Sequence, residues 1–278
     1  MTQEQATISK APTKPKPVAK TTTVKLGAIQ RRDVRKIGVY GPGGIGKTTL
    51  ACTAPGPVAF FDLENSLSVL ADELKGQEVR VVQDINTWQQ LRDALNGGGW
   101  DDIKTIVIDS ASKAEDFAIA HTLLTVPDTQ GNRVSSVEGY GYGKGYQYVY
   151  ETFLYLLADL DKHITAGRNV MLVMHDCTAN VPNPGGDDWI RSEPRLQDTR
   201  GGKASIRLRV RDWLDDLLFI AYDVAVSKEG KGQGSGTRTV WPNELPHFMA
   251  KTRSNLQPMP IDHFSTAIWD NLFSRKGA

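Results

Sequence analysis

The segment GPGGIGKT, residues 41–48, constrains what this chain can fold into more than any other part of the sequence. It follows the apolar run KIGVY and opens a stretch of helical pattern, so it joins a predicted strand to a predicted helix. Its spacing is G-x-x-x-x-G-K-[ST], in which glycines let backbone N–H groups approach a phosphate and the helix N-terminus adds a positive dipole end. The residues expected to hold a nucleotide are Gly41, Pro42, Gly43, Gly44, Ile45, Gly46, Lys47, Thr48 and Thr49.

The polar residues of this loop and of a later strand predict a nucleotide held together with a metal ion. Lys47 is expected to reach the β and γ phosphates, Thr48 to ligate Mg²⁺ and Thr49 to contact the α phosphate. TIVIDS, residues 105–110, places Asp109 at the end of a buried strand, where a carboxylate holds Mg²⁺ through water. The alternative for Asp109 is a helix cap or turn residue. We therefore expect ATP and Mg²⁺ as cofactors, with Thr48 and Asp109 at the metal.

Two more strand ends carry candidates for catalysis. VAFFDLE, residues 58–64, is expected to lie beside the strand before the glycine loop, so Asp62 or Glu64 could deprotonate the attacking water. The spacing alone does not choose between these two carboxylates. His175 follows the strand pattern NVMLVM and is expected at the same sheet edge as Asp109, where it could sense the γ phosphate. A single His at a strand end is also common as a structural residue.

The wider pattern predicts an α/β fold with a mostly parallel sheet flanked by helices and an antiparallel C-terminal edge. Strand patterns at 58–63, 79–82, 103–108 and 169–174 alternate with helical patterns. Ser112 and Glu115 have capping-box spacing, and a longer helix is expected over about 147–166. Past residue 207, LLFIAYDVAV and TRTVW flank a glycine-rich stretch, which indicates a hairpin, and HFMAK is expected to add another strand.

Composition divides the chain into a tail and a body. Residues 1–30 are rich in Lys, Pro, Thr and Ala without hydrophobic periodicity, which predicts a flexible basic tail, and residues 31–278 are expected to form one domain. Nine Lys and Arg stand against two acidic residues up to Lys36, although the whole chain has a net charge of +1. Such a tail serves as a solubilising arm or binds DNA or another subunit.

The location of the protein is also predicted from composition. Cys52 and Cys177 have no metal-site spacing, and the first residues contain no apolar stretch of a secretory signal. No apolar run reaches the roughly 20 residues that span a bilayer. We expect a soluble cytoplasmic protein that does not associate with membranes.

Taken together, these motifs resemble the RecA family of recombinases over about residues 36–261. In that family a short acidic motif after the P-loop helix carries the Glu that activates water, and AFFDLENSL is similar to it, which implies Glu64. The family's Walker B strand ends in Asp-Ser, as Asp109-Ser110 does here. The next strand usually ends in Asn-Gln, and His175 stands there instead. The resemblance implies a RecA-like P-loop NTPase core.

Within that family the layout is most similar to phage-encoded, core-only RecA-like single-strand annealing proteins of the Sak group. This resemblance implies an ATP-dependent single-stranded-DNA-binding protein of phage recombination and repair, active in the host cytoplasm, that anneals or pairs strands. It also implies a homo-oligomer, ring or filament, that hydrolyses ATP at subunit interfaces under DNA stimulation, with a single-strand-binding protein as a further partner. The alternatives are a helicase-type DNA motor and a nucleotide-sensing switch without DNA activity.

Two segments supply candidate DNA contacts. SVEGYGYGKGYQYVY, residues 136–150, sets tyrosines around a lysine on a glycine-rich backbone, which suits stacking on unpaired bases. The alternative is a loop that folds onto its own domain. A later loop mixes basic and acidic residues, so its DNA affinity should be modest and salt-dependent. The candidates are Tyr140, Tyr142, Lys144, Tyr146, Arg191, Arg195, Arg200 and Lys203.

The stretch HFMAKTRSNLQPMPI contributes the last two candidates. In the resembled family a similar stretch carries two basic residues that cross the subunit interface and reach the neighbour's γ phosphate. Lys251 and Arg253 lie on one face if the segment is extended, so both could point at one phosphate. The alternative is a pair of surface charges. With Lys47, Glu64 and His175 they complete the expected catalytic set.

Overall fold

The computed structural model describes residues 24–29, 32–183, 185–199, 201–226 and 232–273. The chain divides into two units, Met1–Arg32 and Asp33–Ala278, and every element below belongs to the second. Most of the basic tail predicted over residues 1–30 lies outside the described residues. Within the described ranges, no helix combines the length and the apolar character that crossing a bilayer requires.

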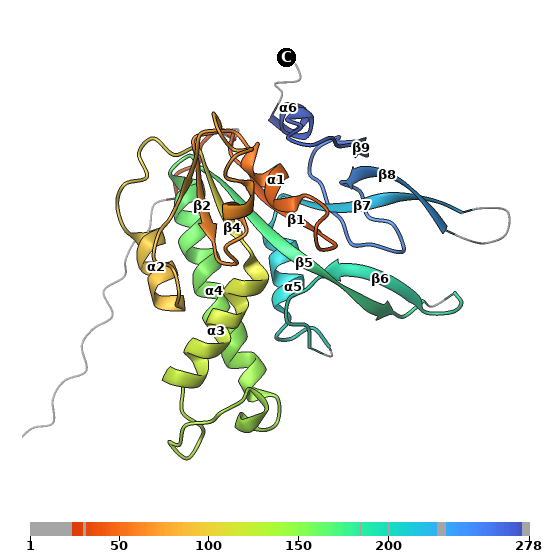
Figure 1. Cartoon of the computed structure of the whole chain (residues 1–278). Helices are drawn as coiled ribbons and strands as arrows, with labels where there is room; N and C mark the ends of the chain where they lie inside the picture. The colour runs from red at the N-terminus through yellow and green to blue at the C-terminus, as the bar shows by residue number, and fades with distance from the viewer. Residues whose placement is uncertain (1–23, 30–31, 184, 200, 227–231, 274–278) are drawn as a thin grey trace, which may run out of the picture. The chain divides into compact units, whose positions relative to one another are not determined.

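The second unit is built on one large sheet with the strand order β3-β2-β4-β5-β1-β7-β8-β9, and β6 pairs with an extension of β5 (Figure 1). The pairings among β1 to β5 and between β1 and β7 are parallel, and those of β6, β8 and β9 are antiparallel. This confirms the predicted α/β class with an antiparallel C-terminal edge. The strands are β1 Lys36–Gly41, β2 Val58–Asp62, β3 Val79–Val81, β4 Thr105–Asp109, β5 Asn169–Val181, β6 Trp189–Pro194, β7 Asp216–Val226, β8 Gly232–Trp241 and β9 Met259–Pro260.

The position of β2 differs from the prediction. β2 was expected beside β1, but it pairs with β3 and β4, and both β4 and β5 lie between it and β1. Because all these strands are parallel, their carboxyl ends still meet at one edge of the sheet. The polar residues that follow them therefore gather at that edge despite the wrong neighbour.

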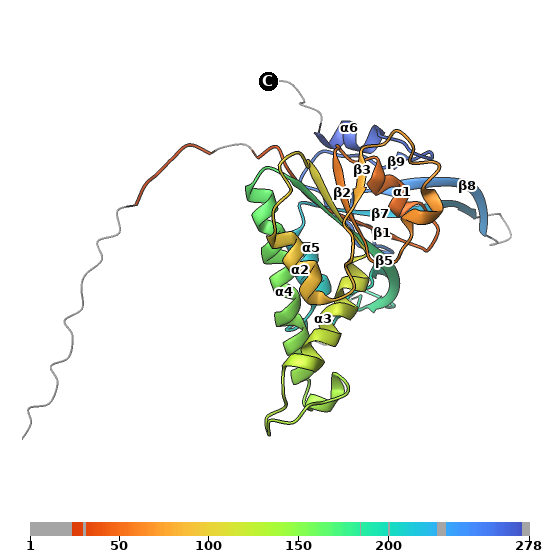
Figure 2. The ribbon, with the colours of Figure 1, turned by 60° about the vertical axis from the view of Figure 1, so that its left-hand side comes forward.

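Helices cover both faces of the sheet, and the alternation of side chains along each strand explains why (Figure 2). In β4, Ile106 and Ile108 join the core beneath α2, α3, α4 and α5, whereas Val107 joins the core beneath α1 and α6. Every residue of β4 is buried, as expected of a strand covered on both faces. The helices are α1 Lys47–Cys52, α2 Trp88–Asn96, α3 Ala111–Thr125, α4 Lys144–Thr165, α5 Ile206–Trp213 and α6 Ala267–Phe273, with 3-10 turns η1 Leu67–Leu70 and η2 Glu138–Tyr140.

The start of α3 corrects one sequence prediction. Its N-cap is Ser110, whose side chain accepts a hydrogen bond from the Lys113 N–H. Ser112 and Glu115, expected to form the capping box, lie inside the helix and instead hold the segment that follows β6. Ser112 Oγ donates to the Arg195 carbonyl, and the Gln197 N–H donates to Glu115 Oε1. Their polar groups therefore serve tertiary contacts.

Two further elements differ from their predicted form. β5 was expected to end at residue 174, but it continues to Val181, leaving the main sheet to pair with β6. HFMAK was expected to form a strand, but it contributes isolated bridges, such as that between Lys251 and Leu217. The C-terminal edge strand is β9 instead.

Helices α3 and α4 lie side by side and extend beyond the sheet (Figure 1). Their connection, residues 126–143, lies at the far end of this pair. We call this projection the α3–α4 arm, and it carries the first of the two segments expected to contact DNA.

Candidate nucleotide site

The glycine loop between β1 and α1 adopts a backbone that requires glycine. Gly41, Gly44 and Gly46 have φ angles of 156°, 73° and 98°. At Gly41 a Cβ would lie 2.3 Å from the carbonyl oxygen of Ile220, so a side chain is excluded by contact as well as by conformation. The loop ends at the first turn of α1, as the sequence predicts, so its N–H groups can converge on a phosphate.

Lys47, at the start of α1, is 8% exposed, and its ammonium lies against the loop. Its Nζ donates hydrogen bonds to the carbonyl oxygens of Gly41 and Pro42, both at 2.8 Å. Burial lowers the pKa of Lys47 from its ordinary value, and the surrounding carboxylates, led by Asp109, oppose that change. A phosphate bound in the loop would add its negative charge to that of the carboxylates and so stabilise the buried ammonium.

Thr48 and Asp109 form a pair of oxygen ligands suited to Mg²⁺. Thr48 Oγ1 donates to Asp109 Oδ2 at 2.6 Å, and Asp109 is 4% exposed at the end of β4. Burial raises the pKa of Asp109 to about 6, while the Thr48 hydroxyl lowers it and Glu64 and Asp62 raise it further. Among the described residues no three His, Cys, Asp or Glu are grouped to hold a metal. A cation beside Thr48 and Asp109 would therefore complete its shell with phosphate and water oxygens, as Mg²⁺ does.

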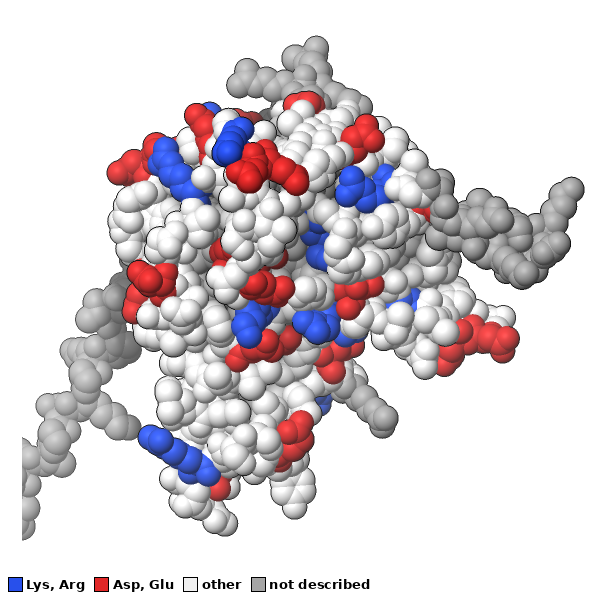
Figure 3. Space-filling model, in the orientation of Figure 1, with Lys and Arg blue, Asp and Glu red and all other residues white. Residues whose placement is uncertain are grey.

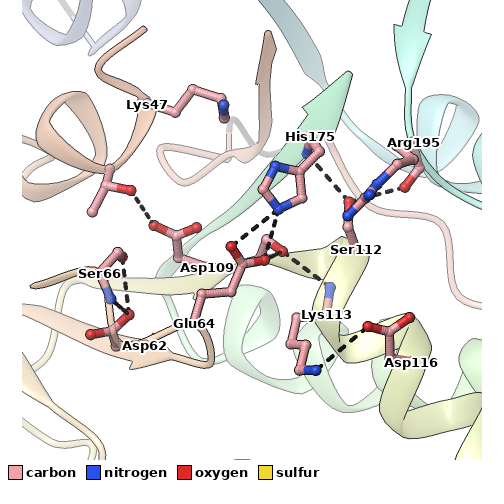
Figure 4. Close-up of polar contacts among 12 residues, drawn as sticks. Lys47, Asp62, Glu64, Ser66, Asp109, Ser112, Lys113, Asp116, His175 and Arg195 are labelled. Atoms are coloured by element: carbon pink, nitrogen blue, oxygen red, sulfur yellow. Dashed lines mark hydrogen bonds and ion pairs between the residues drawn. The ribbon is translucent and has the colours of Figure 1, made fainter. Parts of the chain in front are cut away.

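Asp62, the last residue of β2, and Glu64, two residues further on, have different roles (Figure 4). The Asp62 carboxylate accepts hydrogen bonds from the Ser66 N–H, the Ser66 hydroxyl and the Leu67 N–H, and so holds the start of η1. Glu64 instead accepts from the Ser110 hydroxyl and lies 2.8 Å from His175 Nε2. The geometry therefore favours Glu64 over Asp62 as a residue that can act on a bound molecule.

The charge of Glu64 is set by its neighbours. Its side chain is 31% exposed. Burial alone raises its pKa, but the hydrogen bonds from Ser110 and His175 and the positive charges of His175 and Arg195 outweigh burial, so the pKa lies below its ordinary value. Glu64 is consequently ionised at neutral pH and can accept a proton.

His175 reaches this site from β5, one strand away from the loop. In the sheet it is paired with Gly41, and Asp109 is paired with Val173, so all three lie at the carboxyl edge. The His175 N–H donates to Ser112 Oγ at 3.2 Å, which connects the strand end to α3. The expected proximity of His175 and Asp109 is therefore present.

A cavity of about 350 Å³ joins these residues, and it is lined by the glycine loop together with Lys47, Thr48, Glu64, Asp109 and His175. The side of η1 also contributes Val69 and Leu70, which the sequence analysis did not single out. Val69 is 83% exposed. No motif in the sequence predicts that these two apolar side chains line the cavity.

A second missed residue is Arg238 in β8. Its Nη1 donates to the carbonyl oxygen of Ile45 in the glycine loop at 2.9 Å. The sequence separation is 193 residues, so no local pattern could have signalled this contact.

Two candidates for DNA contact are corrected by the structure. Tyr140 is 8% exposed, and its hydroxyl donates to the carbonyls of Thr122 and Val126, so its ring cannot stack on a base. Arg191 is also 8% exposed and forms ion pairs with Glu193 and Glu244. Both side chains support the fold, because the loop packs on its own helices and β6 carries its own acidic partners.

The remaining DNA candidates differ in exposure. Tyr146 is half-buried on α4, and its hydroxyl donates to Glu138 Oε1 at 2.7 Å. Tyr142, Lys144, Arg195 and Lys203 are exposed. Arg200 lies outside the described residues. On the face drawn in Figure 3, basic and acidic side chains of the described residues are interspersed without a broad basic patch.

Neither Lys251 nor Arg253 is among the residues that line the nucleotide cavity of their own chain. Lys251 Nζ donates to the carbonyls of Arg211, Asp212 and Leu214 at the end of α5. Within this chain the ammonium is thus held at a helix C-terminus, and its reach to a neighbour's phosphate stays a prediction. Arg253, with a side chain 61% exposed, pairs with Asp215 at 3.3 Å.

Comparison with known proteins places this site in a family. Among curated proteins no match is found. The chain is similar to the crystal structure of a KaiC-like protein from the hyperthermophilic archaeon Pyrococcus horikoshii, with 17% sequence identity, a TM-score of 0.44 and coverage of 82% of this chain and 85% of the other. The family model described as AAA domain matches residues 33–254, which include every element of the site. The chain therefore belongs to the AAA domain family.

Proposed function

We propose that this ATPase binds single-stranded DNA in an ATP-dependent manner and anneals or pairs strands in phage recombination and repair. The observation that supports it best is the side chain of Gln197, whose Nε2 donates to the carbonyls of Tyr146 and Ala204 at 2.9 and 2.7 Å. This residue fastens the start of α4 to the turn around residues 201–205. Gln197 therefore joins the two segments expected to contact DNA through their backbones, which supports a shared role for them.

Hydrolysis follows from the residues around the cavity. Lys47 and the loop N–H groups bind the phosphates, and the ionised Glu64 accepts the proton of the attacking water. Thr48 and Asp109 would hold Mg²⁺, which would neutralise phosphate charge if bound with ATP. His175 holds the Glu64 carboxylate and lies where it can respond to the γ phosphate.

DNA contact is assigned first to Tyr142. It has a φ angle of 49° and lies between Gly141 and Gly143, which have φ angles of 70° and 72°. Three successive residues with positive φ turn the backbone at this point, and the side chain of Tyr142 is fully exposed. An exposed ring beside the cation of Lys144 suits stacking on an unpaired base, which is worth about 1–3 kcal/mol.

A continuous set of contacts connects the cavity to this surface. Glu64 contacts His175, whose N–H donates to Ser112, and Ser112 donates to the Arg195 carbonyl. Two residues further on, Gln197 holds both DNA segments. Movement at Glu64 on ATP binding or hydrolysis would reach these segments through this set of contacts, and this is the route that we propose for stimulation of turnover by DNA.

The active form is proposed to be a homo-oligomer, ring or filament, with ATP between subunits. Arg253 is the residue proposed to reach a neighbour's phosphate, because its guanidinium is exposed and Lys251 is committed elsewhere. A single-strand-binding protein is proposed as a further partner that supplies coated DNA.

The proposal is tested by fluorescence anisotropy with a labelled single strand and by ATP hydrolysis with and without that strand. Tyr142→Ala should weaken DNA binding by about 5- to 150-fold, the loss that one stacked base implies. Tyr140→Phe, which removes a buried hydroxyl on the same segment, should leave DNA affinity unchanged. A wild-type protein that neither binds single strands nor is stimulated by them would support a nucleotide-sensing switch instead. Directional unwinding of a forked duplex would identify a motor.

A further inference from the structure

The guanidinium of Arg238 lies against the outside of the glycine loop. Besides its hydrogen bond to the Ile45 carbonyl, Nη1 is 2.5 Å from the point where a Cβ on Gly46 would lie. Arg238 therefore occupies the space that a side chain at Gly46 would need. A strand far along the sequence thus supports the loop at its last residue before α1.

The backbone of Arg238 is fixed from both sides. Arg238 is paired with Tyr222 in β7, and its carbonyl accepts a hydrogen bond from the Ile261 N–H just after β9 at 2.8 Å. β7 in turn pairs with β1, the strand that leads into the loop. The side chain therefore extends from a rigid position in the sheet, so its contact with the loop is not an incidental surface contact.

The atoms at this contact determine its effect. The Ile45 carbonyl and the Gly46 N–H belong to the same planar peptide unit and point in opposite directions. When Arg238 holds the carbonyl on the outside of the loop, the Gly46 N–H is directed to the inside, where phosphate binds. The side chain that donates to this Ile45 carbonyl is that of Arg238.

We propose that Arg238 is a positioning residue for the diphosphate portion of the bound nucleotide. It orients the peptide between Ile45 and Gly46 and places a positive charge behind the amides that bind phosphate. Arg238 should favour nucleoside diphosphates and triphosphates equally, because its contact lies at the glycine loop and not at Glu64 or His175. The inference rests on nucleotide binding at the P-loop and is independent of DNA binding.

The experiment compares Arg238→Ala, Arg238→Gln and Arg238→Lys by titrating ADP and ATP without DNA and by measuring hydrolysis at saturating ATP. Arg238→Ala should weaken ADP and ATP by a similar factor of about 10 while kcat changes less than about threefold, because a charge-assisted hydrogen bond is lost in both complexes. Arg238→Lys should recover much of the affinity. Thr237→Ala, the neighbouring residue on the opposite face of β8, should bind both nucleotides as wild type does.

Specific outcomes would overturn the proposal. If Arg238→Ala has lower thermal stability but unchanged ADP affinity, Arg238 stabilises the fold and does not position the nucleotide. A loss confined to ATP, or to kcat, would place its action at the γ phosphate. If Arg238→Ala does not fold, Arg238→Gln decides, because it keeps most of the side-chain volume without the charge, and its ADP affinity must still fall. Failure of DNA binding in the wild type would affect none of these results.

Discussion

Nε2 of His175 lies 2.8 Å from Oε1 of Glu64, across a separation of 111 residues. The ends of β2 and β5 approach at this point although β4 lies between the two strands in the sheet. Glu64 is also held by the hydroxyl of Ser110, at the end of β4. The carboxylate of Glu64, which faces the cavity, is therefore held by Ser110 and His175. Variants of Glu64 test its catalytic role, and variants of His175 test how it is held.

Glu64→Gln should retain ATP binding and reduce kcat by about 10²- to 10⁴-fold, because a general base contributes that much. Asp62→Asn is the matched control, since that carboxylate only holds η1 through Ser66 and Leu67. It should lower thermal stability and leave kcat close to wild type. Steady-state hydrolysis and nucleotide titration measure both effects. Arrest of turnover by Asp62→Asn with a functional Glu64→Gln would mean that the two carboxylates are interchanged.

His175→Ala should shift the acid limb of the pH–rate profile upward. Glu64 must be ionised to accept a proton, and His175 is one of the donors that lower its pKa. Removing the donor raises the pKa of Glu64, so kcat/KM falls at a higher pH than in the wild type. His175→Gln, which retains an N–H donor in any protonation state, should restore most of the wild-type profile. Identical acid limbs in the wild type and His175→Ala would exclude this support.

Lys47→Ala should abolish detectable hydrolysis and weaken ATP binding by roughly 10- to 150-fold, the range expected for a lost hydrogen bond to a charged group. Lys75→Ala provides the control, because Lys75 is an exposed lysine paired with Asp72 away from the cavity. Isothermal titration with ATP compares the two variants. Wild-type turnover in Lys47→Ala would remove the P-loop assignment.

Glu115 should make stability depend on pH. Burial raises its pKa from 4.5 to about 7, although the Gln197 N–H and the charges of Arg207 and Arg195 oppose this and Asp116 adds to it. The folded state therefore binds the proton more tightly than the unfolded state. The stability gained from this is complete below about pH 4.5 and is lost as pH rises through 7.

The matched variant for this test is Glu115→Gln, which can still accept the Gln197 N–H and does not titrate. Its free energy of unfolding should rise relative to wild type as pH increases from 4.5 to above 7. The difference should reach roughly 3 kcal/mol, since each unit of pKa between folded and unfolded states is worth about 1.4 kcal/mol. Urea unfolding at a series of pH values measures it, and parallel curves for the two proteins would contradict the prediction.

Lys251→Ala and Arg253→Ala should affect different properties, the first the stability of the protein and the second its hydrolysis of ATP. Lys251→Ala leaves three carbonyls at the end of α5 without their donor, so it should lower stability by about 1–3 kcal/mol. Arg253→Ala should leave thermal stability and nucleotide binding nearly unchanged but remove DNA-stimulated hydrolysis if Arg253 acts on a neighbour. Mixing it with Lys47→Ala subunits, which keep their own Arg253, should then restore part of the turnover. No restoration in mixtures shown to co-assemble would exclude hydrolysis shared in this way.

The features that the sequence predicts correctly are those that depend on neighbouring residues. The glycine loop lies between β1 and α1, and Asp109 ends β4, because glycine conformation and a run of β-branched residues act locally. The order of the strands does not follow from such patterns, and β2 was therefore placed beside the wrong strand. The choice of Glu64 over Asp62 came from the family resemblance, and the contacts of Asp62 now supply its physical reason.

The less successful predictions concern side chains whose hydrogen-bond partners lie far away in the sequence, or whose exposure to solvent depends on the fold. Tyr140 and Tyr142 stand two residues apart on the same glycine-rich stretch, yet one is buried and the other fully exposed. The positive φ angles at Gly141 and Tyr142 turn the backbone after Tyr140, and the sequence pattern alone does not predict that turn. Lys251 likewise finds its carbonyl partners on α5, about 40 residues earlier, which its own segment does not reveal.

β5 is one unbroken strand from the main sheet to its pairing with β6, and His175 sits where it leaves the sheet. The six steps from His175 to Val181 along the strand span about 20 Å at 3.3 Å per residue. The outer part of β5 thus extends from His175, which lies beside Glu64, and His175 would be the pivot of any rotation of this part of the strand. A rotation of about 10° at that pivot would move Val181 by about 3 Å, close to the rise of one residue along a strand. Because His175 also lines the nucleotide cavity, a rotation there would couple a change in the cavity to a shift of the outer end of β5 that a bound partner could detect.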